Sequence, residues 1–187
     1  MTAAAKPLRW NAFVVALHCL SAALILELIV HGWIMVHGRL SAATTFDLYQ
    51  QHKSLGFLAL ALTAARLVGR LCFASPAALG SPLWERRLAA FVQGSLYALT
   101  IAAILAGWLV VSASPLPVPT LFFGLIAIPP LTAPNFSLLA AAETAHRLAA
   151  WAIAAAVLLH VAGALKHRFV DRDDVLRRMF FARANPR

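Results

Sequence analysis

The sequence predicts an all-α integral membrane protein, a four-helix bundle, and three features support this fold class. Of 187 residues, 61% are hydrophobic and only 12% are charged, whereas an average soluble domain has about 45–50% and about 25%. Four apolar stretches are each long enough to cross a bilayer, which takes about 20 residues. Basic residues gather on one side of these stretches, as expected of cytoplasmic loops and termini.

The four predicted spans cover about 10–35, 49–73, 88–112 and 143–167. The first is too long for the apolar core of a secretory signal peptide, and it lacks a clear small-residue cleavage site after it. No internal repeat or linker divides the chain. We therefore expect one membrane domain that covers 1–187.

A fifth apolar stretch, Ser114 to Leu139, is not expected to span. Its prolines leave only Thr120–Ile128 uninterrupted, and each proline removes a backbone donor that lipid cannot replace. We predict that about 113–142 is a Pro-rich loop that lies on or dips into the membrane interface. The prolines are Pro115, Pro117, Pro119, Pro129, Pro130 and Pro134.

The formal net charge of +9 would suit nucleic acid, but in a membrane protein the positive-inside rule explains it better. We expect no nucleic-acid partner. With four spans, Arg39, Lys53 and Arg147 fall on the outer side, and the tail 168–187 forms a basic cytoplasmic end. A fifth span would separate the two basic termini, so four spans with both termini cytoplasmic fit best. The inner basic residues are Lys6, Arg9, Arg66, Arg70, Arg86, Arg87, Lys166, Arg168, Arg172, Arg177, Arg178, Arg183 and Arg187.

The histidines are the candidate functional residues, because ionisable residues at membrane depth are costly and usually functional. His146 and His160 are fourteen residues apart, so on a helix they share a face and lie roughly 21 Å apart along the axis. His18 matches the depth of His160, and His52 matches that of His146. Crossing these pairs would require a depth mismatch of about 20 Å. The sequence therefore predicts an inner pair, His18 with His160, and an outer pair, His52 with His146.

Two imidazoles that face each other across a bundle suit six-coordinate haem b, whose iron favours electron transfer over ligand binding. Zinc is the rival metal, but it prefers four ligands in one tetrahedral cluster. The remaining histidines, His31, His37 and His167, are expected near the interfaces and not as ligands. The sequence thus favours one b haem for each pair.

A porphyrin also needs room and cations for its propionates. Gly56 follows His52 by one turn, and the last span is rich in alanine, although small residues equally suit close helix packing. Arg66 and Arg70 are candidate partners for an inner haem, and Lys53 and Arg147 flank the outer ligands. Snorkelling of these cations to the interface is the alternative interpretation.

The chain resembles the bacterial cytochrome b561 family, small four-helix di-haem proteins of the inner membrane, over nearly its whole length. The family's axial ligands map onto the same four histidines. Some relatives have a histidine near the start of helix 3, where this chain has Gln93, which puts in doubt any third-helix histidine in quinone or proton handling. The matching features are His18, Gln51-His52, the ARLVGRL segment with Arg66 and Arg70, LFFGLIAIP, His146 with His160, and the tail DRDDVLRRMF.

The resemblance implies two b haems, a location in the bacterial inner membrane, and electron transfer coupled to ubiquinone. Oxidation of superoxide to O₂ is one activity associated with the family, which would make the chain a superoxide:ubiquinone oxidoreductase. Arg39, Lys53 and Arg147 would form a positive outer mouth that attracts an anion, or would neutralise propionates. Quinone requires an apolar groove with one or two polar contacts, and the sequence does not locate it.

Two other functions stay open at this point. One is a cytochrome b electron-transfer subunit of a multisubunit dehydrogenase or hydrogenase, although such relatives are usually longer and often have an extra helix. The other is a non-enzymatic helical scaffold or metal-handling membrane protein. A preparation without a haem spectrum would favour the scaffold, and co-purification with an iron–sulfur subunit would favour the dehydrogenase subunit.

Overall fold

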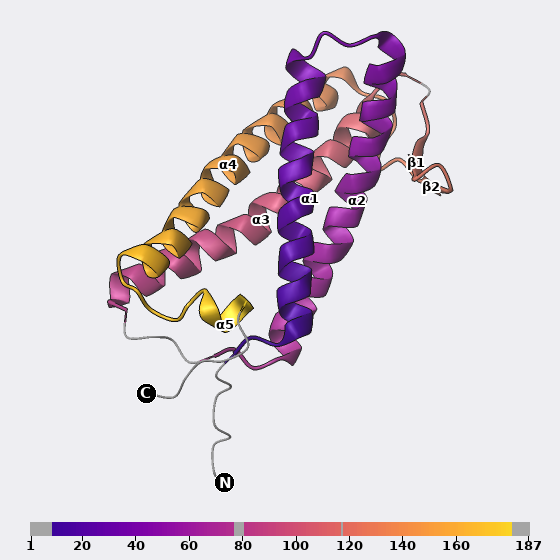
Figure 1. Cartoon of the computed structure of the whole chain (residues 1–187). Helices are drawn as coiled ribbons and strands as arrows, with labels where there is room; N and C mark the ends of the chain where they lie inside the picture. The colour runs from indigo at the N-terminus through magenta and orange to yellow at the C-terminus, as the bar shows by residue number, and fades with distance from the viewer. Residues whose placement is uncertain (1–8, 77–80, 117, 181–187) are drawn as a thin grey trace.

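The computed structural model describes residues 9–76, 81–116 and 118–180, and its four long helices confirm the predicted four-helix membrane fold (Figure 1). Each helix is long and apolar enough to cross a membrane. Among the residues assigned above, Lys6, Pro117, Arg183 and Arg187 lie outside the described part of the chain. The helices are α1 (Ala12–His37), α2 (Ala42–Cys72), α3 (Leu83–Ala113) and α4 (Phe136–Phe169).

Three helices begin earlier than hydropathy suggests. α2 begins at Ala42 and not near 49, α3 at Leu83 and not near 88, and α4 at Phe136 and not near 143. Polar caps explain two of these starts: the Ser41 Oγ accepts the Thr44 N–H at 3.1 Å, and the Asn135 Oδ1 accepts the Leu138 N–H at 3.0 Å. Caps satisfy the first backbone donors of a helix, so the helices continue beyond their apolar portions.

The Pro-rich segment contains regular structure that the sequence did not predict. Strands β1 (Thr120–Phe122) and β2 (Ile126–Ile128) form an antiparallel hairpin, and its turn places Phe123 and Gly124 at positive φ, 49° and 74°. The hairpin occupies the one proline-free run of the segment, because proline cannot donate to a strand ladder. With α4 starting at Phe136, the loop is shorter than the predicted 113–142.

Ser54 fastens this hairpin to α2. Its side chain is 3% exposed, and its Oγ lies 3.1 Å from the Leu121 carbonyl oxygen and accepts the Phe123 N–H at 3.0 Å. The neighbouring Lys53 Nζ donates to the Pro119 carbonyl at 3.4 Å. These contacts hold the hairpin beside the same part of α2 that carries His52.

The helices pack through small residues. Close backbone contacts join α1 to α2, α2 to α3 and α3 to α4, and small side chains allow such approach within a membrane. Large apolar residues such as Trp33, Phe91 and Trp151 are exposed, where they contact lipid. The buried small and hydroxyl residues of the helices are Ser21, Ser54, Ala59, Thr63, Gly69, Thr100, Ala103, Ala106, Ser112, Ala113 and Ala142.

The beginning of α1 and the short helix α5 (Arg177–Phe180) lie at the same end of the bundle (Figure 1). The Trp10 N–H donates to the Arg178 carbonyl at 3.3 Å, so the tail folds back against the start of α1. At the end of α4, the Lys166 Nζ bridges Glu85 of α3, at 3.0 Å, and Asp171, at 2.8 Å. These contacts tie α1, α3 and α4 together at this end.

Replacing Ser54 with alanine is expected to loosen the hairpin, because the Phe123 N–H would lose the Ser54 Oγ as its acceptor. A hydrogen bond contributes about 1 kcal/mol net, so the Phe123 amide should exchange roughly fivefold faster. Hydrogen exchange followed by mass spectrometry in detergent or nanodiscs measures this. Ser137→Ala at an exposed cap is the matched control, and an unchanged rate at Phe123 in Ser54→Ala would show that other contacts hold the hairpin.

Candidate functional site

The helices bring four histidines together in two pairs, at two levels of the bundle. His18 of α1 and His160 of α4 have ring centroids 6.1 Å apart, with an interplanar angle of 63°. His52 of α2 and His146 of α4 also lie 6.1 Å apart, with an angle of 82°. α4 therefore supplies one ring to each pair, and its partner comes from α1 at one level and from α2 at the other.

A fourteen-residue interval recurs on the other two helices. Gly32 follows His18 by fourteen residues on α1, and Arg66 follows His52 by fourteen on α2, so each couple shares a helix face. A Cβ at Gly32 would lie 3.9 Å from the His52 Cε1, and the Arg66 Nη2 lies 3.1 Å from the His18 Nδ1. Each level thus combines two histidines with a third residue, a glycine at the outer level and an arginine at the inner level.

α3 positions the outer pair. The His146 Nδ1 lies 2.8 Å from the Ala103 carbonyl oxygen, which requires the nitrogen to donate and leaves Nε2 available for a metal. A Cβ on Gly107 would lie 3.1 Å from Cε1 and 3.2 Å from Nδ1 of the same ring. Only glycine leaves room for the ring here without a shift. Among the described residues, the His52 Nδ1 is buried and has no hydrogen-bond partner.

The two inner arginines have different surroundings. Arg66 donates to the His18 Nδ1, and its Cζ lies 5.1 Å from the centre of the Tyr97 ring. Arg70 is exposed and donates to the Gln93 Oε1 at 3.3 Å. Arg66 therefore belongs to the inner pair, whereas Arg70 connects α2 to α3 beside it.

The predicted outer cations lie at the margin of the outer pair. Arg39 and Arg147 are exposed, and Lys53 is half-buried against the hairpin. In the part of the chain that the structure describes, none of the three forms an ion pair. They leave a net positive charge at this end of the bundle.

The other histidines have separate environments. His37 is exposed and stacks on Trp33 at 5.2 Å. The Nδ1 of His31 is buried and has no hydrogen-bond partner among the described residues. This residue follows Leu17, Ser21 and Leu24 on the buried stripe of α1.

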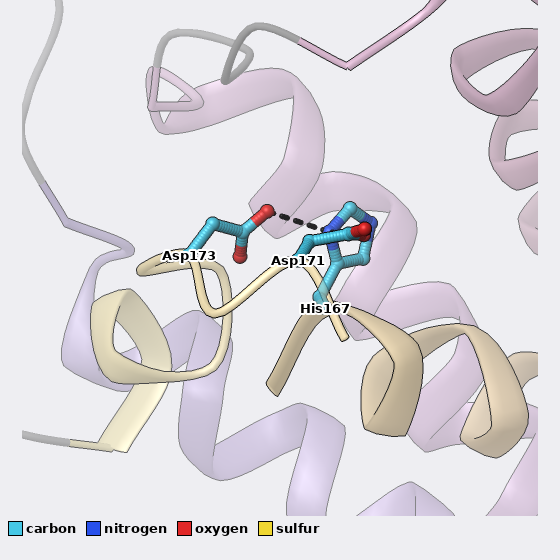
Figure 2. Close-up of side chains that lie close together, drawn as sticks. All are labelled: His167, Asp171 and Asp173. Atoms are coloured by element: carbon cyan, nitrogen blue, oxygen red, sulfur yellow. Dashed lines mark hydrogen bonds and ion pairs between the residues drawn. The ribbon is translucent and has the colours of Figure 1, made fainter. Parts of the chain in front are cut away.

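His167 forms a third cluster, with Asp171 and Asp173, at the inner end of α4 (Figure 2). Its Nδ1 lies 2.7 Å from the Asp173 Oδ2 and 3.4 Å from the Asp171 Oδ2. Both Asp171 oxygens accept from Lys166, at 2.9 and 2.8 Å, so a cation already neutralises this carboxylate. The cluster fastens the tail to α4.

The geometry of the two main pairs fits a metal held between opposed imidazoles. Two metal–nitrogen bonds of about 2 Å each, plus the half-widths of the rings, place ring centres about 6 Å apart. The observed 6.1 Å matches at both levels. A tetrahedral zinc site would instead need four ligands in one cluster, whereas these histidines come in twos. The open space beside Gly56 and Gly163, where an added Cβ would meet nothing within 4 Å, suits a flat cofactor.

Several residues around the pairs are not evident from the sequence. Ala103 acts through its backbone, Gly32 and Gly107 through the lack of a side chain, and Tyr97 through its ring. The fourteen-residue interval is the signal that would have found two of them, because Gly32 follows His18 and Gly107 follows Gln93 by this distance.

The chain is similar to known proteins over most of its length. The sequence profile described as prokaryotic cytochrome b561 matches residues 9–182. The chain is also 30% identical over 174 residues to cytochrome b561 homolog 2 of Escherichia coli (strain K12). This alignment covers 92% of each protein. Proteins of this family bind haem b and transfer electrons as multi-pass bacterial membrane proteins. The chain therefore belongs to the prokaryotic cytochrome b561 family.

Proposed function

We propose that this cytochrome holds two b haems, one at each histidine pair, and relays electrons between a donor outside the membrane and the ubiquinone pool. The single observation that carries the proposal is the pairing of four histidines at 6.1 Å on two levels. Haem b supplies a one-electron couple when it is bound, and ligation by two histidines favours electron transfer over ligand binding. Levels about 21 Å apart along α4 span much of the hydrocarbon core, which is about 30 Å thick.

The protein's own residues orient the ligands. The Ala103 carbonyl fixes the tautomer of His146, and Gly32 and Gly107 leave space beside the outer rings. Arg70 at the inner level, and Lys53 and Arg147 at the outer level, would balance propionate charge, whereas Arg66 lies beside the His18 ring. Ligands held by such surrounding contacts keep their geometry as the charge on the metal changes.

The sidedness follows from charge. The beginning of α1 and α5 share one end of the bundle (Figure 1), and most basic residues lie towards that end, so the positive-inside rule places both termini in the cytoplasm of the inner membrane. His18 with His160 then forms the cytoplasmic level, and His52 with His146 the periplasmic level.

Superoxide is the outer donor that the charge pattern supports best. Arg39, Lys53 and Arg147 form no ion pair among the described residues, and such a positive margin accelerates encounter with a small anion. Electrons taken from superoxide would release O₂ and pass to ubiquinone, which would make the protein a superoxide:ubiquinone oxidoreductase.

Histidine replacement tests the pairing. His160→Ala is expected to lose the inner haem only and His52→Ala the outer haem only, because each removes one of two axial ligands. The measurement is the haem-to-protein ratio with the reduced-minus-oxidised spectrum. His37→Ala, at an exposed histidine outside both pairs, should retain two haems. Two haems per chain in either of the first two variants would contradict the assignment.

Gly107→Ala tests the fit of the outer level, because its methyl group would press on the His146 ring at 3.1 Å. We expect the outer haem to be lost or its absorption band to shift, with the inner haem retained. Gly94→Ala is the matched control on α3, where an added Cβ meets nothing within 4 Å. Equal spectra for the two variants would show that the His146 ring lies elsewhere in the loaded protein.

Charge reversal tests the steering of an anion. Lys53→Glu combined with Arg147→Glu is expected to slow haem reduction by superoxide about tenfold or more at low ionic strength, and less at high salt, because screening removes steering. Stopped-flow absorbance measures the rate. Arg87→Glu, exposed at the opposite end, is the control. An equal rate at low salt would exclude electrostatic steering while leaving the haem assignment intact.

A further inference from the structure

The two histidine pairs have electrically different surroundings. At the outer level, the nearest polar partner of a ring is a backbone carbonyl, that of Ala103, 2.8 Å from the His146 Nδ1. At the inner level it is a guanidinium, that of Arg66, 3.1 Å from the His18 Nδ1. A carbonyl carries partial negative charge towards the ring, whereas a guanidinium carries a full positive charge.

The outer contact favours the oxidised metal. A ligating histidine that donates its second N–H to a carbonyl becomes a more basic ligand. A more basic ligand gives more electron density to the iron and stabilises its ferric state. The Ala103 carbonyl is available for this contact because Gly107, one turn further along α3, lets the His146 ring lie against the helix.

At the inner level it is the positive charge of Arg66, and not a hydrogen bond to the ring, that favours the reduced metal. A histidine that ligates iron through Nε2 carries its proton on Nδ1 and cannot accept a hydrogen bond there. Arginine stays protonated in proteins, and a fixed positive charge beside a metal centre opposes the loss of an electron, more strongly in a low-dielectric interior than in water. Tyr97 holds the guanidinium in place, with the Cζ of Arg66 5.1 Å from the ring centre. No aspartate or glutamate of the described residues pairs with Arg66, so its charge is not neutralised by the protein.

We infer that Arg66 is a positioning residue that sets the inner haem at a higher reduction potential than the outer haem. This inference rests on the proposed function, since it requires one haem at each pair. With a haem held at each pair, one electron would pass from the outer group to the inner one, which oxidises the first and reduces the second, so no further reactant is needed. The difference between the two levels then makes electron transfer towards the inner side favourable.

Single-haem variants of the full chain test the order of the two potentials. His52→Ala retains the inner haem and His160→Ala the outer haem, and a spectroscopic redox titration in nanodiscs gives each potential separately. We expect the inner haem to be the more readily reduced of the two. The reverse order would overturn the inference. A preparation that binds no haem would instead overturn the proposed function.

Substitution of Arg66 tests the cause. In the His52→Ala background, Arg66→Gln is expected to lower the equilibrium constant for reduction of the inner haem about tenfold or more. For a one-electron couple, a tenfold change is a fall of about 59 mV in the reduction potential. Arg66→Lys, which keeps the charge, should restore most of the original potential. Arg87→Gln is the matched control, because it removes the same charge from an exposed residue at the same end of the bundle, outside both histidine pairs.

The outcomes separate charge from packing. An inner potential that is unchanged in Arg66→Gln, or that shifts equally in Arg87→Gln, would overturn the role of Arg66. The same shift in Arg66→Lys as in Arg66→Gln would also overturn it, since the effect would then depend on side-chain shape. If Arg66→Gln fails to bind the inner haem, Arg66→Lys and the order of the wild-type potentials still decide the question.

Discussion

The fourteen-residue interval between His146 and His160 is the constraint on which the rest of the architecture depends. It places two imidazoles on one face of α4, and each must meet a partner across the bundle at its own depth. His18 of α1 lies opposite His160, and His52 of α2 lies opposite His146, at equal ring separations of 6.1 Å. The same interval places Gly32 of α1 at the outer level, beside His52, and Arg66 of α2 at the inner level, beside His18.

The rest of the bundle accommodates this arrangement. α3 contributes a carbonyl and a glycine to the outer level, and its buried residues are mostly small, which brings its backbone close to α4. Large buried side chains are few among the described residues, and most large apolar residues face outward, where lipid is the solvent. The stability of such a bundle comes from close packing and internal hydrogen bonds, because lipid provides no hydrophobic drive between helices.

Much of this could be predicted from the sequence, because membrane depth and helical periodicity are one-dimensional properties. The number of spans follows from apolar lengths and basic residues, and the histidine pairs from helical spacing. The family is indicated by a resemblance of sequence motifs. The helix starts at Ala42 and Phe136 could not be predicted from hydropathy, because Ser41 and Asn135 cap polar turns outside the apolar runs. The hairpin at Thr120–Ile128 depends on Ser54, which is distant in sequence. The separate roles of Arg66 and Arg70 depend on side-chain contacts with Tyr97 and Gln93, which periodicity does not contain.

The contact between Trp10 and Arg178 has a consequence for biogenesis. It joins a residue before α1 to one after α4, so this closure cannot form until the ribosome has made Arg178. α4 is the last of the four long helices in the described chain, and it carries one histidine of each pair. Neither histidine pair is complete before α4 has been made, so on the proposed function haem would be received only after that helix has been synthesised.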